Sequence, residues 1–173
     1  IDNRFISERV NQLRNWNIDF IQGDILDKDL IKKYCQNADI VHHLAGITDV
    51  PRVKSESSTK KDDLINKVAK EGTQNILDVI SDNCKIIMPS SHVVYEGLES
   101  IKKDIQENEK TCPVLSYGKS KDINENQLKA SGKNFIILRL GSVYGYSTDT
   151  ARIDIMANFF AKTASQNGTL RLF

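Results

Sequence analysis

The chain lacks the features that mark membrane, secreted and nucleic-acid-binding proteins. None of its apolar runs approaches the roughly 20 residues needed to span a bilayer. The polar N-terminal segment has no apolar core of the kind a signal peptide carries. Its 24 Lys and Arg residues against 23 Asp and Glu residues leave a net charge of +1, too little for a surface that binds nucleic-acid phosphates. We therefore expect a soluble, cytoplasmic protein with neither a membrane nor a nucleic-acid partner.

Cysteine is scarce as well. The three cysteines, Cys35, Cys84 and Cys112, are far apart and form no CxxC or Cys/His ligand spacing. An odd number of cysteines at such intervals argues against a disulfide framework and against a zinc site. We expect reduced thiols and no bound metal.

What the sequence does contain is typical of one globular domain. It has 173 residues, of which 39% are hydrophobic and 27% are charged. The chain begins with Ile1 rather than Met, and its last residues form a β-like run that ends without a turn. We interpret these two ends as the edges of a piece cut from a longer sequence.

Short apolar segments alternate with helical ones along the chain. Segments rich in Ile, Val, Leu or Phe are typical of parallel strands buried on both faces; we expect them at 18–21, 38–44, 85–88, 135–140 and 169–173. The helices expected between them cover 7–15, 28–37, 59–81, 117–131 and 151–166, and the third has the clearest apolar stripe. Asp27 is a candidate N-cap, and Ser131-Gly132 a candidate helix end. The alternation predicts an α/β fold with a parallel sheet covered by helices on both sides.

Chemistry-bearing residues follow the expected strands. Ligands of such sheets bind beyond the carboxyl ends of the strands, and Ser91 lies just after the third one. Tyr117 and Lys121, four residues apart, share one face of a helix, where the ammonium stabilises a phenolate and lowers the pKa of the phenol. Such a tyrosine exchanges a proton with a substrate hydroxyl near neutral pH. The same spacing also occurs on ordinary amphipathic surfaces, so the position of the pair favours the catalytic interpretation.

Several motifs occur in a fixed order from Asp2 to about Gly145. They are Asp2-Asn3, Gly23-Asp24, His43-Leu44-Ala45-Gly46, Ser90-Ser91-x-x-Val94-Tyr95, Tyr117-x-x-x-Lys121 and Leu138-Arg139-x-x-x-Val143-Tyr144-Gly145. This series resembles the extended short-chain dehydrogenase/reductases, the NAD-dependent epimerase/dehydratase family, whose members act mostly on nucleotide sugars. The resemblance implies a Rossmann-like, doubly wound parallel sheet in three α/β/α layers and NAD as the cofactor.

The resemblance also implies roles for individual residues. Ser91 matches the catalytic serine, Tyr117 the general acid/base, and Lys121 the lysine that also binds the nicotinamide ribose. The implied cofactor-binding residues are Asp2, Asn3, Asp24, Ile25, Leu44, Ala45, Gly46, Tyr117 and Lys121. A carboxylate at Asp2 would accept hydrogen bonds from the adenosine ribose and favour NAD over NADP. The implied substrate contacts are His92, Ser142 and Val143.

Two departures from the family pattern are informative. Members that eliminate water from the sugar generally carry Asp-Glu after the catalytic Ser or Thr, but this chain has His92-Val93, which disfavours dehydration. The phosphate-binding loop G-x-x-G-x-x-G is absent from the sequence. We therefore expect residues 1–173 to form a Rossmann-type domain that is incomplete at both ends, with the substrate-binding region starting at about 146–173.

Three functions stay open. The first is an NAD-dependent epimerase that acts on a nucleotide sugar by transient hydride transfer. The second is a net NAD(P)-dependent reductase or dehydrogenase of a sugar nucleotide or another carbonyl substrate. The third is a dinucleotide-binding sensor or scaffold, which the Ser91, Tyr117 and Lys121 set disfavours because a sensor needs no acid/base. Family members often dimerise through the helices matching 59–81 and 117–131, so we expect a homodimer.

Overall fold

The computed structural model describes residues 10–48, 58–145 and 155–170, which fall into two compact units. The larger unit comprises residues 23–141, and the smaller one combines 1–22 with 142–173. The larger unit holds the sheet, whereas the smaller one holds helix α5 (Met156–Ser165) and a helical stretch at 10–15. None of the helices in these ranges is long and apolar enough to cross a membrane.

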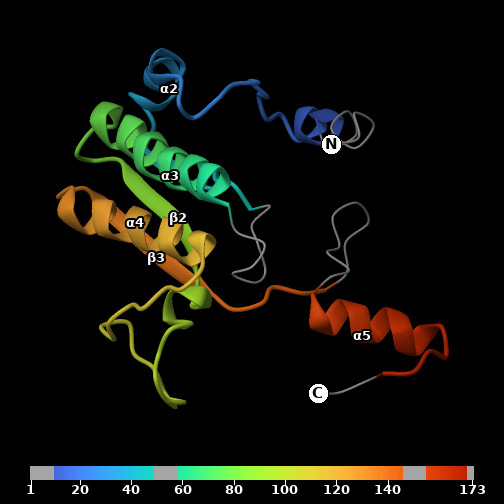
Figure 1. Cartoon of the computed structure of the whole chain (residues 1–173). Helices are drawn as coiled ribbons and strands as arrows, with labels where there is room; N and C mark the ends of the chain where they lie inside the picture. The colour runs from blue at the N-terminus through green and yellow to red at the C-terminus, as the bar shows by residue number, and fades with distance from the viewer. Residues whose placement is uncertain (1–9, 49–57, 146–154, 171–173) are drawn as a thin grey trace. The chain divides into compact units, whose positions relative to one another are not determined.

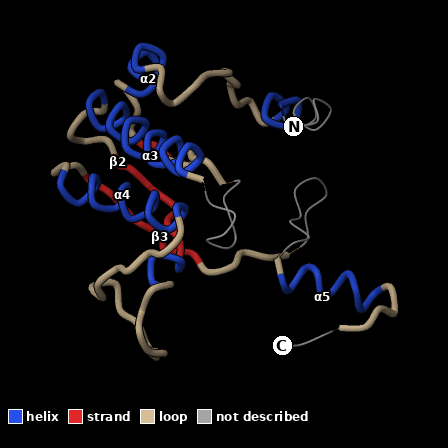
Figure 2. The backbone as a smooth tube through the Cα atoms, in the orientation of Figure 1, coloured by secondary structure: helices blue, strands red, loops and turns tan. Residues whose placement is uncertain are grey.

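The larger unit is built on three parallel strands in the order β1-β2-β3. These strands are β1 (Ile40–His42), β2 (Lys85–Ser91) and β3 (Asn134–Leu140). Its helices are α2 (Lys28–Cys35), α3 (Thr59–Val79), α4 (Ser116–Ala130) and the short 3-10 helix η2 (His92–Tyr95). Helices α3 and α4 pack side by side over β2 and β3 (Figure 1), and Figure 2 shows the same alternation of strands and helices along the chain. This arrangement confirms the predicted parallel α/β fold.

The hydrophobic core lies between the helices and one face of the sheet. Its buried members come from α3, β2, α4 and the turn before β2: Ile76, Leu77, Ile80, Cys84, Ile86, Met88 and Leu128. Because side chains alternate along a strand, those at every second position point to the opposite face. There Ile40, Ile136 and Leu138 are 53%, 41% and 42% exposed. The described part of this unit therefore forms two layers of the three-layer fold, one sheet and one layer of helices.

Local sequence sets the ends of the helices. The Asp27 carboxylate accepts a hydrogen bond of 3.0 Å from the Leu30 N–H and so caps α2, as the sequence predicts. Helix α4 ends at Ala130, and Gly132 follows with a φ of +69°, a conformation that favours glycine. In α3, a Cβ on Gly72 would lie 2.8 Å from the Ile25 side chain, so the glycine lets the segment before α2 approach this helix.

One predicted strand is wrong, and another lies mostly outside the described residues. Residues 18–21 form no strand, because no described segment pairs with them; Phe20 and Ile21 are half-exposed. Residues 169 and 170 are not in a strand either, and 171–173 lie outside the described ranges. The predicted strand at 38–44 is reduced to β1, whereas β2 runs three residues past Met88 and includes Pro89.

Candidate functional site

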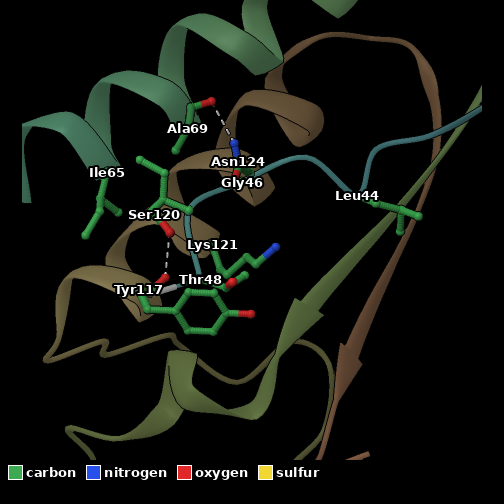
Figure 3. A pocket seen from close by; sticks show the side chains of 10 residues that line it. Leu44, Gly46, Thr48, Ile65, Ala69, Tyr117, Ser120, Lys121 and Asn124 are labelled. Carbon is green, nitrogen blue, oxygen red and sulfur yellow. Dashed lines mark hydrogen bonds between the residues drawn. The ribbon is translucent and has the colours of Figure 1, made fainter. Parts of the chain in front are cut away.

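A pocket lies at the carboxyl end of β1, between the segment that follows this strand and the helices α3 and α4 (Figure 3). Its lining residues are Leu44, Gly46, Ile47, Thr48, Ile65, Ala69, Tyr117, Ser120, Lys121 and Asn124. The structure thus brings two predicted cofactor residues, Leu44 and Gly46, to the same pocket as the predicted acid/base pair of α4. Ala45 lies between them, exposed on the same turn.

Tyr117 and Lys121 lie one turn apart on the pocket side of α4, as their spacing predicts. The Lys121 Nζ is 5.6 Å from the centre of the Tyr117 ring, and both side chains extend from the helix toward the same side (Figure 3). Burial lowers the pKa of Lys121 below its ordinary value. The structure thus places the ammonium beside the ring, as the predicted acid/base role requires, and that role stays a prediction.

Ser91 ends β2 and is almost buried, at 9% exposure. Its Oγ accepts a hydrogen bond of 3.4 Å from the Val93 N–H and caps η2. Ser91 is not among the residues that line the pocket. The structure accounts for Ser91 as a cap, and its catalytic role stays a prediction.

The other predicted cofactor residues lie away from the pocket lining. The Asp24 carboxylate is exposed and accepts a 2.9 Å hydrogen bond from the Leu26 N–H. Ile25 packs against the core, and its carbonyl accepts a 3.0 Å hydrogen bond from the Asn75 amide on α3. Asp2 and Asn3 lie outside the described residues.

The predicted substrate residues are all exposed. His92 is the first residue of η2, and its Nδ1 lies 3.3 Å from the Leu140 carbonyl oxygen at the end of β3. Ser142 and Val143 belong to the smaller unit. Their roles in substrate binding stay predictions.

Sequence reasoning missed a buried ion pair next to the site. Glu125, one turn beyond Lys121 on α4, is 0% exposed. Its carboxylate accepts hydrogen bonds of 2.9 and 2.6 Å from the Nε and Nη2 of Arg139 and one of 2.7 Å from the Ser90 hydroxyl. Burial alone would raise the pKa of Glu125, but hydrogen bonds from Arg139, Ser90 and Lys129 outweigh it and lower this pKa to about 2.

This pair ties together the elements that carry the predicted catalytic residues. Arg139 comes from β3 and also donates to the Tyr95 hydroxyl of η2 and, at 3.0 Å, to the Glu107 carbonyl. Ser90 precedes Ser91 on β2. A signal was present in the sequence, because Glu125 continues the four-residue spacing of Tyr117 and Lys121.

A second buried polar cluster joins β1 to the helices. His43 is 4% exposed, and its Nε2 lies 2.8 Å from the Thr73 Oγ1 of α3. Asn124 of α4 donates to the same hydroxyl and, at 2.9 Å, to the Ala69 carbonyl. Burial and the nearby charge of Lys121 lower the pKa of His43 to about 4. His43 is therefore a neutral, structural histidine beside the pocket.

Comparison with known families shows which family the chain belongs to. Residues 2–171 match the model of the NAD dependent epimerase/dehydratase family. The chain belongs to this family. The family predicted from the motifs is therefore confirmed.

Curated relatives of the chain are longer proteins. The CDP-paratose 2-epimerase of Salmonella typhi is 29% identical over 154 residues, which cover 75% of this chain and 44% of that protein. The 3beta-hydroxysteroid-dehydrogenase/decarboxylase isoform 2 of Arabidopsis thaliana is 26% identical over 146 residues, 77% of this chain and 24% of that protein. The chain thus spans less than half the length of both relatives.

Solved structures of family members share the fold. The UDP-glucose 4-epimerase of Brucella ovis, in complex with NAD, is 27% identical with a TM-score of 0.61 over 75% of this chain and 40% of its own. The UDP-glucuronic acid 4-epimerase of Bacillus cereus, in complex with NAD, is 25% identical with a TM-score of 0.66 over 96% of this chain and 51% of its own. This similarity confirms the Rossmann-like α/β fold.

Proposed function

We propose that the protein carrying this chain is an NAD-dependent epimerase of a nucleotide sugar. The observation that carries the proposal is the shared pocket of Tyr117, Lys121 and the turn Leu44–Gly46 at the carboxyl end of β1. Rossmann-type sheets bind dinucleotides at this end of their strands. The relatives named as sugar-nucleotide epimerases support the same reaction class.

The pocket residues fit the ribose side of a dinucleotide. Ammonium groups carry three N–H donors, and within the described ranges Lys121 gives one of them to the Pro89 carbonyl. Leu44 and Gly46 are exposed and line the same pocket, and the space around the position that a Cβ of Gly46 would take is open to 4 Å. We assign Ala45, Asp24, Ile25, Asp2 and Asn3 to the same cofactor on the motif pattern.

The proposed mechanism assigns one task to each residue. Tyr117, as the phenolate, removes the proton of a sugar hydroxyl, and Lys121 keeps that phenol acidic. Ser91 donates a hydrogen bond to the oxygen that becomes a carbonyl. NAD, which Lys121 and the turn Leu44–Gly46 would hold, would supply a reversible hydride acceptor for the sugar carbon that carries this hydroxyl, so the reaction would consume no net cofactor. The substrate contacts would come from His92, Ser142 and Val143.

The test uses the intact protein. It should retain NAD through purification, and it should interconvert epimers of a UDP- or CDP-sugar, followed by NMR, with no net production of NADH. In the Tyr117→Phe variant we expect turnover to fall by about 10²- to 10⁴-fold while bound NAD is kept. Tyr34→Phe, on the exposed side of α2, is the matched control and should leave turnover unchanged.

Two outcomes would contradict the proposal. Wild-type turnover in the Tyr117→Phe variant would remove the assigned acid/base. Stoichiometric formation or loss of NADH would instead assign a net reductase or dehydrogenase. That reaction class is favoured by a further relative, the probable low-salt glycan biosynthesis reductase Agl14 of Haloferax volcanii, 27% identical over 156 residues.

We further propose a cytoplasmic homodimer. The support for a dimer is Leu64, a large apolar side chain of α3 that is 51% exposed. Sedimentation equilibrium of the intact protein, with Leu64→Gln as the variant, tests this assembly. A wild-type protein that sediments as a monomer would contradict it.

A further inference from the structure

Pro89 occupies an unusual place, because it lies inside β2, the central strand of the sheet. Proline has no N–H, so central strands normally exclude it. The backbone bonds around it show which edge it faces: Lys85 donates to the Asp39 carbonyl, and the Ile87 carbonyl accepts from His43, both at 2.9 Å. The N–H and C=O groups of alternate residues point to the same edge of a strand, so Pro89 faces the β1 edge as well.

At Pro89, however, β1 has already ended. The last pair of the β1–β2 register is His42 with Ile87, whereas β3 pairs with β2 as far as Ser91. One more step of a parallel ladder would take the N–H of residue 89 to the His43 carbonyl, and the N–H of Ala45 to the carbonyl of residue 89. A proline cannot make the first of these bonds.

The chain turns where the ladder stops. The Leu44 N–H bonds back to the His42 carbonyl at 3.0 Å, which bends the backbone directly after His43. The turn Leu44–Gly46 then leaves the sheet and enters the pocket lining. A missing donor on β2 and a turn on the facing strand thus occur at the same level of the sheet.

The Pro89 carbonyl has a different partner. It accepts a hydrogen bond of 2.9 Å from the Lys121 Nζ, and it is the same carbonyl to which the Ala45 amide would donate in a continued ladder. The same bond holds the ammonium beside the Tyr117 ring, 5.6 Å from its centre. Helix α4 and the strand end are therefore joined through one carbonyl oxygen.

We propose that Pro89 is a positioning residue of the active site, which ends the β1–β2 ladder so that its carbonyl is reserved for Lys121. This inference rests on the proposed function, in which Lys121 serves Tyr117 and binds the cofactor ribose. Any other residue at position 89 supplies an N–H toward His43. The ladder can then extend by one step, and the Ala45 amide competes with Lys121 for the carbonyl of residue 89.

The experiment compares two forms of the intact protein. Pro89→Ala introduces an N–H. A second form carries lactic acid at position 89, which has the alanine side chain but an ester oxygen in place of the N–H. We expect the Ala form to stay folded, to protect its new amide from hydrogen exchange, and to lose about tenfold to a hundredfold in turnover. Its pH–rate profile should move to higher pH, because the phenol loses part of the stabilising charge. The ester form should restore most of the turnover.

Three results would overturn the inference. They are wild-type turnover and pH profile in the Ala form, an unprotected amide at residue 89, and equal impairment of the Ala and ester forms. The last would mean that the proline ring matters rather than its missing donor. Failure of the proposed function is distinguishable, because the wild-type protein itself would then lack NAD-dependent turnover. In that case NMR tests whether the Pro89 carbonyl holds the Lys121 ammonium. Slow exchange of the ammonium protons in wild type and faster exchange in the Ala form would support the inference. Equal exchange rates would contradict it.

Discussion

Helix α4 carries two charged clusters one turn apart, and their surroundings differ. The pocket cluster is Lys121 with Tyr117, and the ion-pair cluster is Glu125 with Arg139. Lys121 faces the pocket and, within the described ranges, hydrogen-bonds only to the Pro89 carbonyl. Glu125 is fully buried and accepts hydrogen bonds from Ser90, Lys129 and Arg139. Burial lowers the pKa of Lys121, which disfavours its charged form. The hydrogen bonds to Glu125 lower the pKa of Glu125, which favours its charged form, the carboxylate.

The difference separates a charge that fixes the fold from one that is available to a ligand. A buried ion surrounded by donors resists replacement, because its partner charge would be left unpaired. A half-buried ion with few hydrogen bonds has lost part of its hydration without full compensation, and its remaining N–H donors are available to another molecule. Substitutions in the two clusters should therefore affect stability and activity in opposite proportions.

Replacement of Lys121 gives the largest expected effect on activity. In Lys121→Met we expect turnover of the intact enzyme to fall by about a hundredfold or more, because the phenol of Tyr117 loses the charge that keeps it acidic. The free energy of unfolding should stay equal or rise, since a poorly compensated charge is replaced by an apolar chain of similar length. Steady-state kinetics and urea denaturation measure the two quantities. Lys119→Met, on the exposed side of the same helix turn, is the control for both.

Replacement of Glu125 should have the reverse pattern. In Glu125→Gln we expect a loss of about 3 to 5 kcal/mol in the free energy of unfolding, because Arg139 remains with no ionic partner. Lys129 is the matched control, since it bonds the same carboxylate from an exposed position. Lys129→Met should cost less than about 1 kcal/mol. Equal losses in Glu125→Gln and Lys129→Met would contradict the assignment of the stability to the buried Glu125–Arg139 pair.

The sequence predicts the pocket cluster, Tyr117 and Lys121, better than the ion-pair cluster, Glu125 and Arg139. A helical spacing, a strand end and a family motif all indicate Tyr117 and Lys121. Glu125 and Arg139 lie on different elements, and their contact depends on how α4 packs over β3. The four-residue spacing places Glu125 on the same face of α4 as Lys121, but it does not show which strand residue that face meets.

The strands show the same limit. The run at 85–88 predicts most of β2, but its continuation through Pro89 depends on where the neighbouring strand stops. The apolar run 18–21 has the composition of a strand and still forms none, because strands require a paired neighbour. Composition indicates which segments are able to pair, and only the arrangement in space decides which of them do.

His43 offers a third, smaller test, because it is a neutral group held beside the Lys121 charge. Burial and that charge lower its pKa from 6.5 to about 4. Between these pH values the unfolded chain binds a proton that the folded protein does not, so the free energy of unfolding falls as pH decreases, by about 3 to 4 kcal/mol at most. Urea denaturation at a series of pH values measures this slope, which His43→Gln should remove and the exposed His42→Gln should not.

The same series of urea denaturations also tests Glu125 and Lys121 on α4. The pKa of Glu125 is lowered from 4.5 to about 2, so its contribution to the free energy of unfolding is lost as pH falls from about 4.5 to 2, a range that overlaps the His43 range only near pH 4. Lys121→Met removes one of the two causes that lower the His43 pKa, so the loss between pH 6.5 and 4 should become smaller in that variant. An unchanged slope would mean that burial alone keeps His43 neutral and that the Lys121 charge has no effect on the pKa of His43.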